Sequence, residues 1–389
     1  ASTWQWSRAS GGWANAPAGR VDANGYPMVV PPGTFAGLVL DMHPGNANVP
    51  YSYSSAPGVS VDGATAPGVF NKTQANQRII ARVTAGISAL SIHESTANLD
   101  DFWYPPFVER CKRFGCLRFM NWASVNDARQ VSWETRVMPG WYTQGDREVA
   151  YELQLQLAEK AGADAWLCVH HTADNSYVRS LARLCRGKVT GGIYLEHSNE
   201  VWNWIFPQAR YCAERSPVTG SPMEYHIRRT AEIAKIFREE GVEVVSVLGA
   251  QSVASGHFDW VLSKLGPLPV EIDAIAIAPY FGHSVTNEAK ASGIDAVLAQ
   301  CEAEIDKNRA DVAQWRAICE RFKLRLVAYE GGQHLQATWQ EQSNQTLVEL
   351  LIDCNRHPRM GQLYKKYLAA WDQDTDKALM CLFNSVYPP

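Results

Sequence analysis

The chain has 389 residues, of which 46% are hydrophobic and 20% are charged, so it is large and apolar enough to bury a sizeable core. Its formal net charge of −4 provides no basic stripe, which argues against nucleic acid or an anionic membrane surface as a partner. The longest apolar runs fall short of a membrane span, so no membrane insertion is expected. The 14 tryptophans are unusually many, and exposed tryptophan offers a flat stacking surface for sugar rings.

Nine cysteines are an odd number, so at least one thiol is unpaired within the chain. No two of them have a spacing typical of a metal site, and most fall in predicted helices or strands. We therefore expect mostly buried, reduced thiols, with room for one disulfide.

Residues 1–28 are rich in tryptophan and lack a clear periodic pattern. We assign them to the N-terminal part of a barrel, whose first strand would lie near 3–7 or before residue 1. The turn-forming run at 22–27 separates this part from the next region of the chain.

Residues 29–98 have a different texture, with short β-like runs separated by Gly, Pro, Asn and Ser and with no helical periodicity. The best strands are predicted at 35–40, 78–83 and 89–93, and the residues at 82–86 suggest a hairpin. We predict a small all-β module inserted near the N-terminus. It is either a glycan-binding accessory or a packing ornament, and the absence of a visible row of aromatics favours the second.

From 99 to 389 segments of strand length alternate with amphipathic segments of helix length, the pattern of a parallel sheet with helical crossovers. The fold class expected is therefore α/β, specifically a (β/α)8 barrel of the TIM type, with the eighth strand supplied near the N-terminus. The predicted strands begin near residues 116, 165, 192, 242, 272, 324 and 378. The predicted helices are 106–114, 148–161, 175–184, 222–240, 258–264, 294–322, 347–355 and 360–370.

Two of the predicted strands lead into a glutamate at their C-terminal ends. The strand that contains Ile193 and Tyr194 continues into Glu200, and the apolar run at 324–328 continues into Glu330 and two glycines. Because a parallel barrel gathers the C-terminal ends of its strands at one face, the two carboxyl groups are expected to face each other. Two facing carboxyls suit glycoside hydrolysis, one as an acid and the other as a nucleophile or base.

The segments Ser198-Asn199-Glu200 and Tyr329-Glu330-Gly331 resemble the fourth-strand and seventh-strand signatures of the clan A retaining glycoside hydrolases. The resemblance implies that Glu200 is the acid/base and Glu330 the nucleophile. It also implies that Asn199 binds the sugar 2-hydroxyl and that Arg118 donates a hydrogen bond to Glu330, which would keep this carboxylate ionised.

The chain is also similar to bacterial proteins described as cellulose-binding, through residues 117–122 and 194–204. One departure from the clan is Phe383-Asn384 at the last predicted strand, where the clan usually has a tryptophan. The departure leaves the floor of the subsite beside the nucleophile undefined.

Glu200 must be protonated at rest, and we expect apolar neighbours and a nearby negative charge to raise its pKa. Glu196 lies on the same face of the strand as Glu200 and competes with Glu330 as the partner of Arg118. The candidates for substrate contact are Arg118, Trp122, Asn126, His170, His171, Asn199, Trp202, Tyr280 and His283. Tyr280, at the end of the sixth predicted strand, is placed to donate its hydroxyl to Glu330. Several candidates have a structural alternative: His170 or His171 as satisfied buried side chains, Trp202 as core, and Tyr280 as a rim aromatic.

The sequence predicts a retaining glycosidase that cleaves a β-linked polysaccharide or oligosaccharide, with β-glucan or cellulose favoured, and that uses no cofactor and no metal. The first alternative is a glycan-binding protein on an inactive barrel. The second is a metal-dependent hydrolase with a metal at His170, His171 and His283. Export to a secreted or periplasmic location is inferred from a polymeric substrate, and the oligomeric state is left open.

Overall fold

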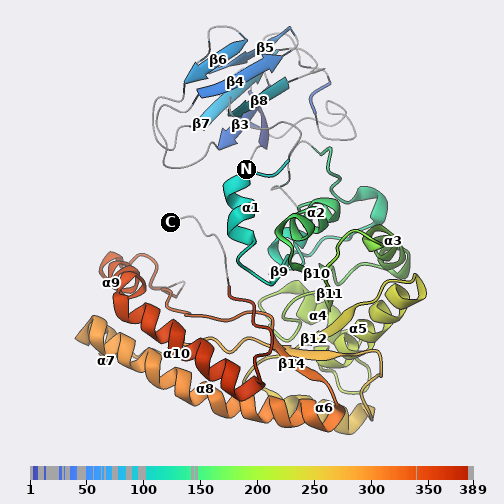
Figure 1. Ribbon diagram of the computed structural model, residues 1–389, viewed down its shortest axis with the longest axis vertical. Helices are drawn as coiled ribbons and strands as arrows, with labels where there is room; N and C mark the ends of the chain where they lie inside the picture. Colours follow the sequence, from blue (N-terminus) through green and yellow to red (C-terminus); the bar gives the residue numbers. More distant parts are fainter. Residues whose placement is uncertain are drawn as a thin grey trace. The chain divides into compact units, whose positions relative to one another are not determined.

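The computed structural model describes most of the chain from residue 102 onward and the strands and short turns that precede it (Figure 1). The described residues are 3–7, 13–14, 26–28, 30, 36–41, 50–55, 57–62, 64, 67–71, 78–84, 90–94, 102–141, 144, 148–338 and 340–383. The chain divides into two compact units. Residues 1–114, 121–124 and 134–162 form the first, and residues 115–120, 125–133 and 163–389 form the second.

The first unit contains two small antiparallel sheets, in agreement with the β-rich character predicted for this part of the chain. The five-stranded sheet has the order β2-β1-β3-β7-β5, and the three-stranded sheet has the order β6-β4-β8. The strands are β1 (Thr3–Ser7), β2 (Trp13–Ala14), β3 (Ala36–Asp41), β4 (Pro50–Ser55), β5 (Val59–Val61), β6 (Gly68–Asn71), β7 (Arg78–Val83) and β8 (Leu90–Glu94). The same unit contains helices α1 (Pro105–Cys111) and α2 (Tyr151–Ala161) and the 3₁₀ turn η1 (Asn121–Ala123).

Two expectations for this unit are wrong. The hairpin expected at 82–86, of which residues 85 and 86 lie outside the described part of the chain, would pair β7 with β8; instead β7 pairs with β3 and β5, and β8 pairs with β4 in the other sheet. The strand at 3–7 is not part of a parallel barrel, because it pairs antiparallel with β2 and β3. The predicted division of the chain at residues 28 and 98 stays a prediction.

The second unit is built on one parallel sheet of six strands in the order β14-β13-β12-β11-β10-β9. Its strands are β9 (Cys116–Arg118), β10 (Asp164–Val169), β11 (Ile193–His197), β12 (Val245–Gly249), β13 (Ala274–Ile277) and β14 (Arg325–Ala328). Six of the seven predicted parallel strands are therefore confirmed. The seventh is present only as a parallel bridge between Ala328 and Met380.

The described residues thus form a half-barrel and not the closed eight-stranded barrel that the sequence predicted. The eighth strand was expected near 3–7 or before residue 1, and residues 3–7 belong to the antiparallel sheet instead. The half-barrel is strongly curled. Arg118 ends β9 and Glu330 follows β14, so they lie at opposite edges of the sheet, yet their side chains are 2.9 Å apart. Five spacings of about 4.8 Å would separate the same strands by roughly 24 Å in a flat sheet.

The helices of the second unit follow the predicted ones closely, and α8 and α10 lie side by side (Figure 1). Two short helices were not predicted, α4 and α7, although Pro207 at the start of α4 and the capping Thr286 before α7 are typical start signals. None of the described helices is both long and apolar enough to cross a membrane. The helices are α3 (Asn175–Cys185), α4 (Pro207–Ala213), α5 (Pro222–Glu239), α6 (Ser255–Leu265), α7 (Asn287–Ser292), α8 (Ile294–Phe322), α9 (Gln345–Arg356) and α10 (Pro358–Thr375); the 3₁₀ turn η2 spans Trp133–Thr135.

The two faces of the parallel sheet have different chemistry. On one face Leu248, Ile275 and Leu326 pack with helix residues such as Phe258 and Trp315 in a large apolar core. Successive side chains of a strand point to opposite faces. Glu196, which is in register with Cys168 on β10 and Val247 on β12, therefore lies on the other face. Glu196 and its partner Arg118 thus lie on the concave side of the sheet, opposite the apolar core.

A pair of buried histidines joins β11 to α5. The Nδ1 atoms of His197 and His226 are 2.9 Å apart, so one imidazole donates and the other accepts. Burial lowers the pKa of His226 to about 3 and lowers the pKa of His197 well below its usual value, with a further contribution from His226. Both side chains are therefore neutral in the folded protein near pH 7.

This pair predicts a loss of stability in mild acid. Below the ordinary histidine pKa of about 6.5 the unfolded chain binds protons that the folded imidazoles do not. The free energy of unfolding should then fall as the pH falls, by up to about 1.4 kcal/mol per pH unit for each histidine. His226→Gln should show a shallower decline between pH 7 and pH 5 in urea unfolding. Equal slopes for wild type and His226→Gln would contradict the assignment.

Candidate active site

The chain bends sharply where β11 ends. Ser198 and Glu200 have φ angles of 60° and 40°, in the left-handed region that residues other than glycine rarely adopt. The bend is held by hydrogen bonds from the Ser198 N–H to Val169 and from the Asn203 N–H to the Glu200 carbonyl, at 2.7 and 2.9 Å. Strained backbone of this kind persists only where the surroundings impose it, and it gathers at functional sites. Here the bend aims the Glu200 side chain.

The end of β14 depends on close packing. A methyl group at Gly331 would collide with the hydroxyl of Tyr367, and Gly332 has a φ of 121° that an L side chain rarely adopts. The two glycines after Glu330 thus allow the chain to turn directly after this glutamate.

Arg118 links both strand ends. Its Nε and Nη2 donate to Glu196 Oε2 at 3.0 and 2.8 Å, and its Nη1 donates to Glu330 Oε1 at 2.9 Å. Nη2 also donates to Asn199 Oδ1 at 2.8 Å. The predicted contact with Glu330 is therefore present, and the competition between Glu196 and Glu330 for the arginine does not arise, because one guanidinium serves both.

The aromatic surroundings of Arg118 complete its environment. The guanidinium carbon lies 5.5 Å from the ring centroid of Trp166 and 5.0 Å from that of Tyr329, within the range of a cation–π contact. The arginine side chain is only 6% exposed, so its position is set by packing as well as by charge.

Glu196 holds Arg118 in place and does not line the cavity that lies beside Glu200. It is buried, and its Oε2 also accepts from the Trp166 indole N–H at 2.9 Å. Burial raises the pKa of Glu196, and the positive charge of Arg118 acts in the opposite direction. An added methyl group at Gly249 would approach Glu196 Oε1 to 3.1 Å, so the glycine on the neighbouring strand leaves room for this carboxylate.

Glu330 has a fixed orientation because each of its oxygens accepts a hydrogen bond. Arg118 binds Oε1, and the Tyr280 hydroxyl donates to Oε2 at 2.8 Å. The predicted contact between Tyr280 and Glu330 is therefore present. Burial raises the pKa of Tyr280, and the negative charge of Glu330 raises it further, so the phenol stays a donor.

Glu200 has a different environment. The Tyr329 hydroxyl donates to Oε1 at 3.0 Å and the Asn203 side chain donates to Oε2 at 3.1 Å. Burial raises the pKa of Glu200 and the charge of Glu330 raises it further, whereas the two hydrogen bonds lower it. The net shift is upward, in the direction expected from the sequence.

Glu200 opens into a cavity of about 300 Å³, called here the Glu200 cavity. This volume is at the lower end of the range of small-molecule sites. Its lining includes Glu200, Trp202, Tyr280, His283, Tyr329 and His334.

Asn126, His170 and His171 are predicted contact residues that do not line the Glu200 cavity. Asn126 Oδ1 accepts from the side chains of Asn199 and Gln208, at 3.2 and 2.6 Å, and so helps to hold Asn199. His170 is buried, with its ring nitrogens 3.1 Å from Asp127 Oδ1 and 3.0 Å from Thr172 Oγ1.

His171 is also buried and stacks on His170, with ring centroids 4.3 Å apart. Burial lowers the pKa of His171 to about 4. For His170 the structure thus agrees with the structural alternative, whereas His171 Nδ1 is buried without a hydrogen-bond partner among the described residues. His283 is half-exposed, lines the Glu200 cavity and lies 3.3 Å from Glu304, a contact that raises its pKa.

The remaining predicted residues divide between the two units. Trp202 lines the Glu200 cavity. Asn199 is buried, with its carbonyl on Arg118 and its NH₂ on Asn126. Trp122 belongs to the first unit, where it stacks on Trp103 with ring centroids 5.8 Å apart, and its contact with substrate stays a prediction.

A metal site at His170, His171 and His283 does not form. Among the residues that the structure describes, no group of three His, Cys, Asp or Glu side chains is arranged to hold a metal ion.

The residues that sequence reasoning missed include Asn203, Tyr329 and Trp166, which contact the carboxylates, and His334, which lines the Glu200 cavity. Two of them had a signal. Tyr329 directly precedes Glu330 at the predicted strand end, and Trp166 lies on the same strand face as Cys168, beside the strand that contains Glu196. His334 lies in a loop, where no periodic pattern indicates direction.

No protein-family model and no curated protein matches the chain. Similar solved structures include an endo-β-1,4-mannanase of glycoside hydrolase family 26 from Cellulomonas fimi, at 15% identity over 60% of this chain and 51% of that chain, with a TM-score of 0.37. Another is a GH51 arabinofuranosidase from Xanthomonas axonopodis pv. citri, at 12% identity over 75% of this chain and 62% of that chain, with a TM-score of 0.43. A third is xylanase10C from Cellvibrio japonicus, at 9% identity over 97% of this chain and 88% of that chain, with a TM-score of 0.39. The chain thus spans about half of the mannanase and under two thirds of the arabinofuranosidase. These neighbours are glycoside hydrolases by name, and similarity at this level does not identify the reaction or the substrate of this chain.

The network predicts a large stability cost for losing Arg118. Arg118→Ala would leave the buried carboxylates of Glu196 and Glu330 without their cation, which typically destabilises a protein by about 3–5 kcal/mol. Urea unfolding at pH 7 measures the effect. Arg183→Ala removes a surface arginine that is 61% exposed and paired with Glu240, and it should change the free energy of unfolding little. Similar small losses for both variants would show that the network does not hold the sheet.

Proposed function

We propose that the protein is a retaining glycoside hydrolase in which Glu330 is the nucleophile and Glu200 the general acid and base. The proposal rests on the different surroundings of two carboxyl groups at the ends of different strands. One is oriented by an arginine and a tyrosine, and the other has a raised pKa beside a cavity. Retaining glycosidases need this pairing of an oriented carboxylate with a protonated acid.

Two observations support the proposal that the two groups act on one bond. Tyr329 is the neighbour of Glu330 in the chain, and its hydroxyl contacts Glu200. In addition, the charge of Glu330 is the second-largest cause of the raised pKa of Glu200. A substrate in the Glu200 cavity would meet the acid directly.

The first step forms a bond between a Glu330 oxygen and the anomeric carbon of the sugar. The bond from this carbon to the glycosidic oxygen breaks, and Glu200 gives its proton to the departing oxygen. Arg118 and Tyr280 hold Glu330 in place for the attack. In the second step the Glu200 carboxylate takes a proton from water, the water oxygen bonds to the anomeric carbon, and the Glu330 ester bond breaks.

The favoured substrate is a β-linked polysaccharide or oligosaccharide, with β-glucan first because of the likeness to cellulose-binding proteins noted in the sequence. A polymeric substrate of this kind implies a secreted or periplasmic protein. The alternative, a glycan-binding protein without hydrolysis, is favoured by one observation: Trp204, close to the cavity, is 65% exposed.

A glycan panel of β-glucan, mannan and xylan tests the proposal. Wild type should release reducing sugar from at least one of them. Glu330→Gln should lower the rate by at least about 1,000-fold because it removes the nucleophile while conserving shape. Glu214→Gln, at a surface glutamate that is 64% exposed, is the matched control and should act like wild type. Hydrolysis by Glu330→Gln at the wild-type rate would rule out the assigned nucleophile, and binding without hydrolysis by wild type would favour the alternative.

The pH dependence of the reaction tests the role of Glu200. The acid must be protonated, so activity should fall as the pH rises through the raised pKa of Glu200. Tyr329→Phe removes a hydrogen bond that lowers this pKa, so the basic limb of the kcat/KM profile should move to higher pH. Tyr364→Phe, at a tyrosine whose hydroxyl accepts from the Gln333 N–H, should leave the limb where it is. A shift of the Tyr329→Phe limb to lower pH would mean that another group is the acid.

A further inference from the structure

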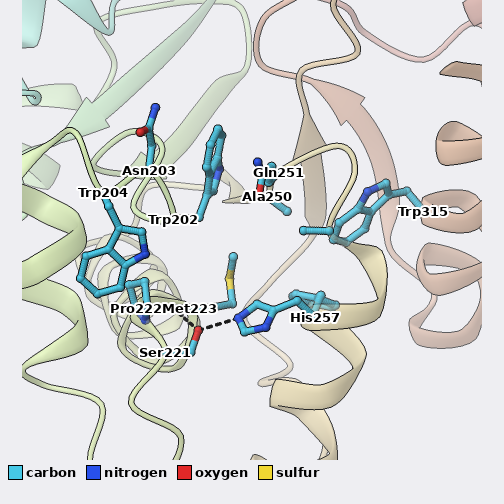
Figure 2. Close-up of a pocket in the computed structure, with 12 residues that line it drawn as sticks. Trp202, Asn203, Trp204, Ser221, Pro222, Met223, Ala250, Gln251, His257 and Trp315 are labelled. Carbon is cyan, nitrogen blue, oxygen red and sulfur yellow. Dashed lines mark hydrogen bonds between the residues drawn. The ribbon is translucent and has the colours of Figure 1, made fainter. Parts of the chain in front are cut away.

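A second cavity adjoins the Glu200 cavity (Figure 2). It has a volume of about 430 Å³, and we call it the Trp204 cavity. Trp202, Asn203 and Gln251 line both cavities. Figure 2 shows Trp202 and Trp204, from the loop after β11, on one side and His257, from α6, on the other. The proposed function uses only the first cavity and leaves the second unassigned.

The lining of the Trp204 cavity suits a neutral ligand with both apolar and polar parts. None of the described residues that line it is an Asp, Glu, Lys or Arg. Trp202, Trp204 and Met223 supply apolar surface, whereas Gln251 and the pair formed by Ser221 and His257 supply polar groups. A sugar ring matches this lining, because it has an apolar face of C–H groups and an edge of hydroxyls. A phosphate or a uronic acid would have no cation to pair with there.

Two further observations point to a bound ligand. The indole N–H of Trp202 is buried and has no hydrogen-bond acceptor among the described residues. Buried donors are almost always paired, so a ligand hydroxyl or a water is expected at this atom. In addition, Trp204 is 65% exposed and Trp260, which stacks on His257 at 5.4 Å, is 43% exposed. Large aromatic surface left in water beside a cavity is typical of a binding site.

The position of Asn203 shows which part of a substrate would enter this cavity. Asn203 holds Oε2 of Glu200 and lines both cavities, whereas Tyr329, the neighbour of Glu330, holds Oε1 and lines only the Glu200 cavity. Under the proposed function, the sugar that becomes attached to Glu330 would lie on the Tyr329 side. The sugar that departs with the proton of Glu200 would then lie on the Asn203 side, toward the Trp204 cavity.

We propose that the Trp204 cavity binds a neutral sugar unit of the leaving group, with its ring against Trp204 and a hydroxyl on the indole N–H of Trp202. This inference rests on the proposed function, since it takes Glu200 as the acid. It implies that the protein prefers oligosaccharides of uncharged sugars whose leaving portion is long enough to reach the cavity.

Trp204→Ala tests the proposal. The measurement is the ratio of kcat/KM for a hexasaccharide of the cleaved glycan to kcat/KM for the 4-nitrophenyl glycoside, whose leaving group is too small to fill the cavity. The ratio should fall about tenfold, which corresponds to about 1.4 kcal/mol of lost interaction. Ile205→Ala is the matched control, because Ile205 is 78% exposed and lines neither cavity, and it should keep the wild-type ratio. A wild-type ratio in Trp204→Ala would overturn the proposal and leave the proposed function intact.

A binding experiment distinguishes the proposed sugar site in the Trp204 cavity from the proposed hydrolytic function. Calorimetric titration of the Glu200→Gln, Glu330→Gln double variant with cellohexaose, mannohexaose and xylohexaose gives Kd values that do not depend on turnover. Adding Trp204→Ala should weaken the tightest of them about tenfold. If wild type hydrolyses no glycan but this loss is seen, the function fails and the sugar site stands. If no hexasaccharide binds, or if a hexauronide binds as tightly as the neutral ones, the sugar site is wrong.

Discussion

The guanidinium of Arg118 is the interaction on which the site depends. It is buried, it contacts two aromatic rings and it donates to Glu196, Glu330 and Asn199. Burying a cation without partners is prohibitively costly, so each of its acceptors is needed to keep it in place. Because Arg118 and Glu330 come from the two edge strands, their contact requires the curl of the sheet. The contacts that neutralise the buried arginine can therefore form only in a curled sheet.

The curled sheet also explains how two glutamates acquire different properties within a small volume. Glu330 faces the arginine and a tyrosine hydroxyl, whereas Glu200 stands on a strained bend with only neutral donors beside it. A buried carboxyl group that is close to another carboxylate favours its protonated form. The separation of roles proposed for the two glutamates thus follows from which strand end each one occupies.

The sequence predicted most of this frame. Apolar runs of strand length between amphipathic segments of helix length located six strands of the parallel sheet and most helices, because buried parallel strands and amphipathic helices leave strong local patterns. The contact of Arg118 with Glu330 was predicted from the resemblance of short motifs, and the contact of Tyr280 with Glu330 from the position of Tyr280 at the end of a predicted strand. The antiparallel pairing of 3–7 was not, since pairing partners far apart in sequence leave no local signal. Asn203 and His334 were missed for a related reason: a loop has no period from which the direction of a side chain can be inferred.

The residues that contact Arg118 lie far apart in the sequence, so they are synthesised at different times. Arg118 and Glu330 are 212 positions apart, whereas Arg118 and Glu196 are 78 apart. During synthesis from the N-terminus, the arginine and Glu196 leave the ribosome well before Glu330 exists. Of the two carboxylates, Glu196 is therefore the one that is available to the arginine first, before the proposed nucleophile has been made.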